Sequence, residues 1–139
     1  MHRIALHTIQ SVDNLPLIAV KATLGKHKGY FIVDTGAQIC LIGDHLTDFE
    51  YEEIDFEKQD ASVMGILDNE TLNVTIIFVK NLKLARRNFD LGPSFVMPIQ
   101  HIQDKIKKKY QILGIIGNSF LEFYEAIIDY RSKELFLNL

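Results

Sequence analysis

Residues 31–42 read Phe-Ile-Val-Asp-Thr-Gly-Ala-Gln-Ile-Cys-Leu-Ile, and this stretch decides the fold that we predict. Three apolar residues run into Asp34, Thr35 and Gly36, and a second apolar run follows Ala37. The pattern predicts a strand, a tight turn and a second strand, because glycine accepts turn geometries that a Cβ would resist. A carboxylate fixed in such a turn can act as an acid or a base. Taken alone, however, such an Asp more often does no more than accept hydrogen bonds from the turn's own amides.

The flanking sequence predicts a mostly β chain, in which short apolar runs alternate with turn residues. The predicted strands are residues 15–24, 30–34, 38–42, 46–60 (an acidic edge strand), 62–67, 71–79, 81–84, 112–117, 126–130 and 134–139. A glycine-bounded turn at 25–29 joins the first two strands, so their hairpin ends at Asp34. Residues 86–93 are predicted to be a polar connection.

One or two short helices complete the prediction. Pro98 opens the first helix, because apolar residues recur at roughly helical spacing from Ile99 to Tyr110. Lysines 107–109 would then lie in its last turn, where cations suit the helix dipole. This lysine run could bind phosphate, but a solvated helix end is the interpretation that the nearby acids favour. Asn118 is predicted to begin the second helix, of one or two turns.

Length and composition narrow the function classes. A chain of 139 residues fits a single domain over 1–139, and 47% hydrophobic with 24% charged residues excludes a disordered or fibrous chain. The net charge of −3 gives no overall field for nucleic acid, and no apolar run approaches the roughly 20 residues of a membrane span. The first ten residues lack a signal-peptide core. The single Cys40 cannot form an intrachain disulfide, so we expect a cytoplasmic protein.

A second informative stretch is residues 112–121, Ile-Leu-Gly-Ile-Ile-Gly-Asn-Ser-Phe-Leu. Glycine inside an apolar strand marks a close approach of another backbone. Together with the Asp34 stretch, this segment resembles the sequences of the retropepsin-like aspartic proteases, particularly of their cellular and bacterial members. The resemblance implies one half of a closed β-barrel-type acid protease, which two identical chains complete around a twofold axis.

The resemblance also implies a role for each matching residue. Asp34 would be the catalytic carboxylate, the Thr35 hydroxyl would cross to the partner loop, and Gly36 and Ala37 would complete the active-site loop. The strand Ile115-Ile116-Gly117 would thread beside that loop. The family's substrate-covering flap would fall on the hairpin from 63 to 75, with Val63, Met64, Gly65 and Ile66 near the substrate.

Two positions depart from the retroviral pattern. Gln38 stands where the retroviral enzymes have an acid, and Asn118 stands where they have a basic residue. Because both side chains are neutral, we expect a hydrogen bond between them in place of an ion pair. The predicted flap has only Gly65 where the family has a glycine-rich tip.

The chemistry explains why two chains are needed. Peptide hydrolysis requires a base that activates water and an acid that protonates the leaving amide, and two carboxylates sharing one proton supply both. One Asp-Thr-Gly per chain therefore predicts an endopeptidase with an Asp34/Asp34′ dyad at a homodimer axis, with no cofactor and no metal. Apolar residues of the predicted flap indicate a peptide or protein substrate with hydrophobic side chains at the cleavage site.

Other functions were weighed against this one. The principal alternative is a catalytically silent module of the same fold that binds peptides or mediates dimerisation. A thiol hydrolase built on Cys40 is disfavoured, because the histidines are scattered and Cys40 lies in an apolar strand. The acidic residues of 46–60 lack the loop spacing of a calcium site, so we interpret them as a solvated face.

Overall fold

The computed structural model describes residues 1–54 and 75–139. The strands are β1 (His2–Ala5), β2 (His7–Gln10), β3 (Pro16–Leu24), β4 (His27–Val33), β5 (Cys40–Gly43), β6 (Tyr51–Glu53), β7 (Thr75–Val79), β8 (Leu82–Leu84), β9 (Arg87–Phe89), β10 (Gly92–Met97), β11 (Ile112–Ile116), β12 (Ile127–Asp129) and β13 (Glu134–Leu137). The helices are α2 (Gln100–Gln103) and α3 (Asn118–Phe123). The mostly β fold class predicted from the sequence is therefore confirmed.

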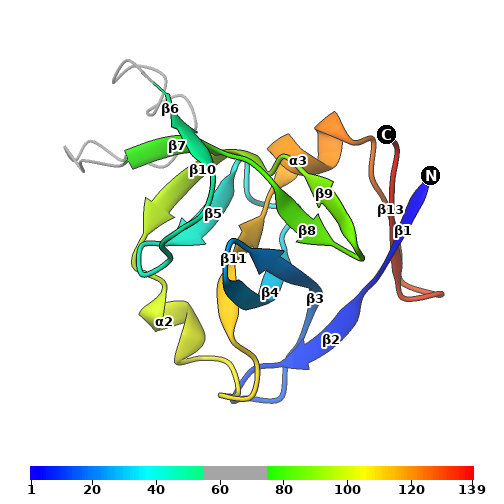
Figure 1. Cartoon of the computed structure of the whole chain (residues 1–139). Helices are drawn as coiled ribbons and strands as arrows, with labels where there is room; N and C mark the ends of the chain where they lie inside the picture. Colours follow the sequence, from blue (N-terminus) through cyan, green and yellow to red (C-terminus); the bar gives the residue numbers. More distant parts are fainter. Residues whose placement is uncertain (55–74) are drawn as a thin grey trace.

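Most strands belong to one strongly curled sheet with the order β6-β7-β10-β5-β11-β4-β3-β8-β9, and β2 pairs with β3 (Figure 1). Strand β4 has β3 antiparallel on one side and β11 parallel on the other. Strand β11 in turn pairs antiparallel with β5. The segments before and after Asp34 are therefore both hydrogen-bonded to β11.

A smaller sheet with the order β1-β13-β12, here called the terminal sheet, joins the two ends of the chain (Figure 1). His2 pairs with Leu137 and Ala5 pairs with Glu134 in antiparallel register. The Leu6 amide donates a hydrogen bond to the Lys133 carbonyl, where the chain leaves this sheet for β2. The termini thus share one face of the molecule.

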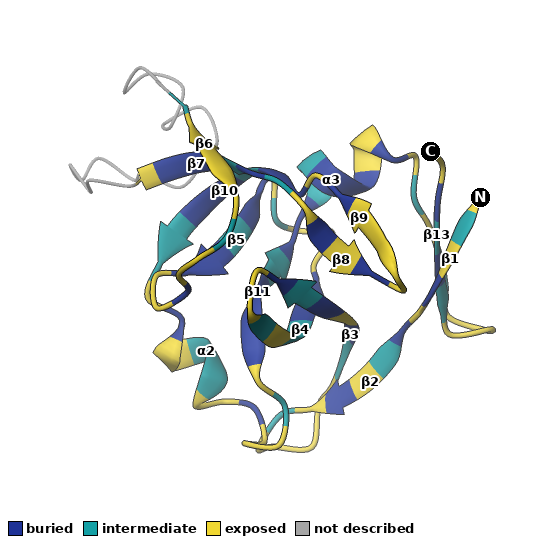
Figure 2. Ribbon diagram, in the orientation of Figure 1, coloured by how far each residue is buried: buried dark blue, intermediate teal, exposed yellow. Residues whose placement is uncertain are grey.

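The core explains why the last three residues of β4, Phe31 to Val33, are all apolar. Phe31 and Val33 belong to the main buried cluster, whereas Ile32 belongs to a second cluster on the opposite side of the sheet. Both faces of β4 are covered at this end, and a strand segment covered on both faces needs apolar residues at every position, whereas Lys28 near the other end of β4 is exposed. Strand β3 instead alternates, with Val20 and Leu24 buried and Lys21 exposed (Figure 2).

The structure corrects the sequence prediction at the less apolar segments. Residues 86–93 contain β9 and the start of β10 instead of a polar connection, and β1 and β2 were not predicted. The exposed residues of β9 made it read as a loop. The acidic strand predicted at 46–60 is reduced to β6 within residues 1–54.

The helix predicted from Pro98 to Tyr110 is wrong beyond its first turn, because α2 ends at Gln103. The Gln103 side chain accepts a hydrogen bond from the Ile112 amide at 2.8 Å and donates one to the Tyr110 carbonyl at 2.9 Å. These bonds hold a loop in place of further helix. Lysines 107–109 therefore lie in this loop. Neither helix of the described segments has the length and hydropathy that crossing a membrane requires.

Candidate active site

Asp34 follows the last residue of β4 and lies exposed in a tight turn. Its amide donates to the Ile116 carbonyl at 3.0 Å, and its carbonyl accepts from the Ala37 amide at 3.2 Å. The Gly36 amide donates to the carboxylate oxygen Oδ1 at 2.9 Å. The backbone on both sides of Asp34 is therefore anchored, and one carboxylate oxygen is oriented by the loop itself. None of the hydrogen bonds among the described residues engages the other oxygen, Oδ2.

Strand β11 runs beside this loop, with Ile115 opposite Ile32 and Ile116 opposite Val33. Beyond the strand, the Asn118 amide donates to the Ala37 carbonyl at 2.8 Å. Gly117 is buried at the junction, where an added Cβ would lie 2.8 Å from the Ala37 carbonyl oxygen and closer still to that of Ile39. Contacts this short exclude any side chain at position 117.

The Asn118 side chain has a different partner from the one that the sequence predicts. Its Nδ2 donates to the Thr35 carbonyl at 2.7 Å, whereas Gln38 is exposed. The Asn118 side chain therefore supports the Asp34 turn through the backbone of that turn. The predicted pairing with Gln38 presumed that a neutral pair would keep the arrangement of an ion pair. An amide is not bound to that arrangement, because it can donate to any nearby carbonyl.

Cys40 is a supporting residue whose role the sequence did not show. Its Sγ accepts a hydrogen bond from the Gly117 amide at 3.3 Å and lies 3.8 Å from the Ser119 hydroxyl. Burial raises the pKa of the thiol, which keeps it protonated and chemically inert. Cys40 thus joins β5 to the glycine junction as a buried thiol. A single cysteine in an apolar strand carries no sequence signal for such a contact.

The remaining predicted site residues fall into two groups. Thr35 and Gly36 are exposed at the turn and Ala37 is half-buried beside them, in the same loop as Asp34. Val63, Met64, Gly65 and Ile66 lie outside the described residues. Among residues 1–54 and 75–139, no three His, Cys, Asp or Glu side chains group as metal ligands.

The fold of the chain is similar to that of known structures. A structure of the retroviral protease-like domain of Ddi1 from Leishmania major is 16% identical in sequence, with a TM-score of 0.53, and the match covers 88% of this chain and 90% of that one. The chain has the retropepsin-like fold. A retropepsin-like aspartic protease from Rickettsia conorii is 18% identical over 99% of this chain and 95% of that one, with a TM-score of 0.46. No protein-family model and no curated protein matched the sequence.

Identities this low show a shared fold and leave activity to be argued from the site. Within the retropepsin-like fold of this chain, the Asp34 turn protrudes from sheet positions that are themselves deeply buried. Phe31, Cys40 and Ile116 have no exposed surface. The loop is exposed, but the strands that position it are not.

Proposed function

We propose that the protein is an aspartic-type endopeptidase that works as a homodimer, in which each chain supplies one Asp34 carboxylate. The observation that carries the proposal is the exposed carboxylate of Asp34, which backbone hydrogen bonds to β11 and to its own turn hold in place. A merely structural Asx-turn would be satisfied by the bond to Gly36. Such a turn would not need β11 and Gly117 packed against it.

The reaction needs two such carboxylates close together. Like charges about 3 Å apart resist joint ionisation, so the pair holds one proton between them. The ionised member takes a proton from water as the water oxygen attacks the scissile carbonyl carbon. The protonated member supplies the proton that the leaving nitrogen acquires when the C–N bond breaks. One chain has one such loop, so the site is complete only with a second copy.

The terminal sheet offers an edge for that second copy. In the described part of the chain β12 pairs with β13 alone, so its other edge carries unpaired backbone groups. Ile127 on this strand is 51% exposed, and Tyr130 at its end is 64% exposed. An open edge with apolar side chains favours association with another strand, and twofold pairing is the commonest closed arrangement.

The unpaired Cys40 fits the reducing cytoplasm that the sequence predicts.

The substrate would be an extended peptide with hydrophobic side chains at the cleavage site, bound by strand addition. The alternative is a silent module of the same fold, which would dimerise and bind peptide without cleaving it. The Asp34 carboxylate separates the two functions, because cleavage requires it and peptide binding does not.

The test is the Asp34→Asn variant, with Asp13→Asn as a control that removes an exposed carboxylate from another turn. Both proteins are incubated with a library of hydrophobic peptides between about pH 4 and 7, and the products are measured by mass spectrometry. We expect the parent and the control to cleave with a bell-shaped pH profile, because one shared proton must be kept. We expect Asp34→Asn to form the dimer but to cleave nothing.

Two outcomes would contradict the proposal. Cleavage by Asp34→Asn at the parent rate would exclude the carboxylate mechanism. A parent that sediments as a dimer and binds peptide without cleaving it at any pH in that range would identify the silent module.

A further inference from the structure

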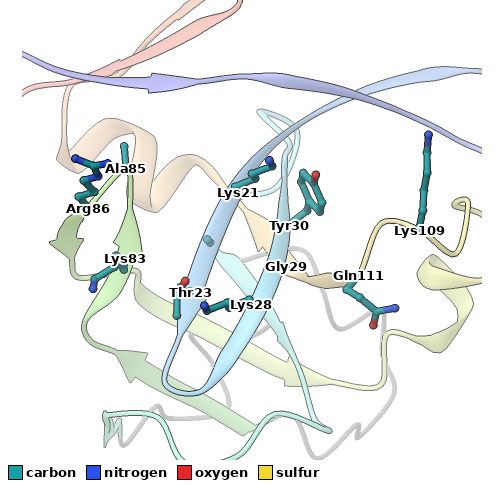
Figure 3. A pocket seen from close by; sticks show the side chains of 11 residues that line it. Lys21, Thr23, Lys28, Gly29, Tyr30, Lys83, Ala85, Arg86, Lys109 and Gln111 are labelled. Carbon is teal, nitrogen blue, oxygen red and sulfur yellow. The ribbon is translucent and has the colours of Figure 1, made fainter.

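Five cationic side chains from separate segments line one pocket of about 440 Å³ (Figure 3). They are Lys21 of β3, Lys28 of β4, Lys83 of β8, Arg86 of the β8–β9 turn, and Lys109 of the loop before β11. We call this feature the cationic pocket. Its other lining residues are neutral, so no carboxylate contributes to the wall. This is unusual in a chain whose net charge is −3.

Strand register brings the lysines together. Thr23 of β3 pairs with Lys28 on one side and with Lys83 on the other. The three residues therefore form a row across three strands, roughly 10 Å from end to end. Lys21 lies two residues from Thr23 on the same face of β3, because strand side chains alternate between faces.

None of these five cations forms a salt bridge with an acid of the described residues. The salt bridges among residues 1–54 and 75–139 use Arg3, Lys26 and Lys80, and none uses a cation of the pocket. Like charges on neighbouring strands repel one another. Ala85 and Arg86 at the rim form the two-residue turn of the β8–β9 hairpin, and their φ values of +47° and +69° are those that such a tight turn requires. This turn directs the Arg86 cation to the lysine row, and five cations gathered at one place without an acid in the pocket lining indicate an anionic ligand.

The wall of the pocket presents mainly side chains to a ligand. Strands β3 and β4 pair with each other along this wall, Lys21 with Tyr30 and Thr23 with Lys28, so the backbone groups between the two strands are occupied. The cations that line the pocket are side chains, and recognition of an anion would come from them. Tyr30, the aromatic residue of the lining, makes T-shaped contacts with His7 and with Tyr110.

We propose that the cationic pocket binds an oligophosphate, meaning three or more linked phosphate groups, either free or at the end of a nucleotide. Such a chain concentrates several negative charges within the span of the lysine row, and lysine and arginine are the usual partners of phosphate oxygens. The pocket volume lies within the range of small-ligand sites. Lys28 and Asp34 are separated by about 20 Å along β4, so the two sites are distinct, and this proposal does not depend on the proposed protease activity.

The test is calorimetric titration of the whole chain at about 0.15 M salt. The probes are tripolyphosphate, ATP, AMP and hexaglutamate. We expect saturable binding of one tripolyphosphate per chain, and ATP within a few-fold of it if nucleotides are accepted. AMP should bind at least about tenfold more weakly, because a single phosphate reaches few of the cations.

Matched variants locate the site. Lys28→Gln and Lys109→Gln each remove one cation of the pocket, and we expect each to weaken tripolyphosphate binding about five- to tenfold. Lys26→Gln lies in the same hairpin as Lys28, and Lys107→Gln lies in the same lysine run as Lys109, but neither lines the pocket. These controls should change affinity less than about twofold, and Asp34→Asn should not change it. Circular dichroism of each variant verifies that it is folded.

Three results would overturn the proposal. Absence of saturable tripolyphosphate binding at about 1 mM would exclude the site. Equal losses in the pocket variants and in their controls would show a response to net charge alone. Tighter binding of hexaglutamate than of tripolyphosphate would assign the pocket to acidic polypeptides instead.

Discussion

The Asp34 loop and the cationic pocket lie along the same strand, β4, and are built in opposite ways. The loop is one continuous stretch of chain, and backbone hydrogen bonds to β11 hold it. The pocket gathers exposed side chains from five segments, which strand register, a hairpin turn and a loop bring together. The packing of the loop requires that residue 117 has no Cβ. The pocket instead depends on the charges of its side chains.

This difference predicts how each region responds to substitution. A change at the glycine junction must move backbone, which is expensive in a close-packed interior. A change in the pocket alters charge on a solvated face and should affect ligand binding much more than folding. The free energy of unfolding of matched variants measures that contrast.

The largest effect is expected for Gly117→Ala. The added Cβ would lie 2.8 Å from the Ala37 carbonyl oxygen, and we expect the free energy of unfolding in urea to fall by about 3 kcal/mol. Gly92→Ala is the control, because a Cβ there meets only Phe78 at 3.9 Å, while φ is +82°. It should cost about 1 kcal/mol from backbone strain alone. Equal losses for the two variants would mean that the junction is looser than the structure shows.

A smaller effect is expected at alkaline pH from Cys40. Burial raises the pKa of this thiol in the folded protein, so the unfolded chain ionises first as the pH rises. The stabilisation that the neutral thiol gives is complete below the thiol pKa of the unfolded chain, about 8.5. It is lost as the pH rises through the higher thiol pKa of the folded protein. Compared with Cys40→Ala, the parent should lose up to about 1.4 kcal/mol more per pH unit in that window. Parallel pH curves for the two proteins would contradict this account of Cys40.

The smallest effect, and one of opposite sign, is expected for Lys28→Gln and Lys83→Gln. Each variant relieves repulsion between neighbouring strands, so stability without ligand should rise by about 0.3 kcal/mol at low salt. The gain should vanish at high salt, where such repulsion is screened. Urea unfolding at two salt concentrations measures both values. A loss of stability in either variant would show that these lysines contribute to folding.

The sequence predicted the fold class because its signals are local. The apolar run before Asp34 indicates burial, and Gly114 of β11 and Gly117 just after it each indicate the close approach of another backbone. Strands β1 and β2 lacked such a signal. Each has four residues and a single buried side chain, and β1 depends on a partner strand at the other end of the chain.

The cationic pocket could not be predicted for a related reason. The sequence placed Lys109 at the end of a helix, whereas hydrogen bonds of the Gln103 side chain end that helix and hold the following loop near β4. The hydrogen bonds of the Gln103 side chain thus determine where the Lys109 charge lies. The partners of Lys109 come from distant segments, and the spacing of lysines in the sequence carries no information about strand register.

The pairing of β1 with β13 has a consequence for the order of folding. His2 pairs with Leu137, so nearly the whole chain must be present before the first strand has its partner. Contacts between residues so far apart in sequence form slowly, because the long intervening chain must first be ordered. During synthesis, β1 leaves the ribosome before β13 and has no partner until β13 follows. If the terminal sheet also carries the dimer contact, an incomplete chain has no way to assemble the pair of Asp34 loops.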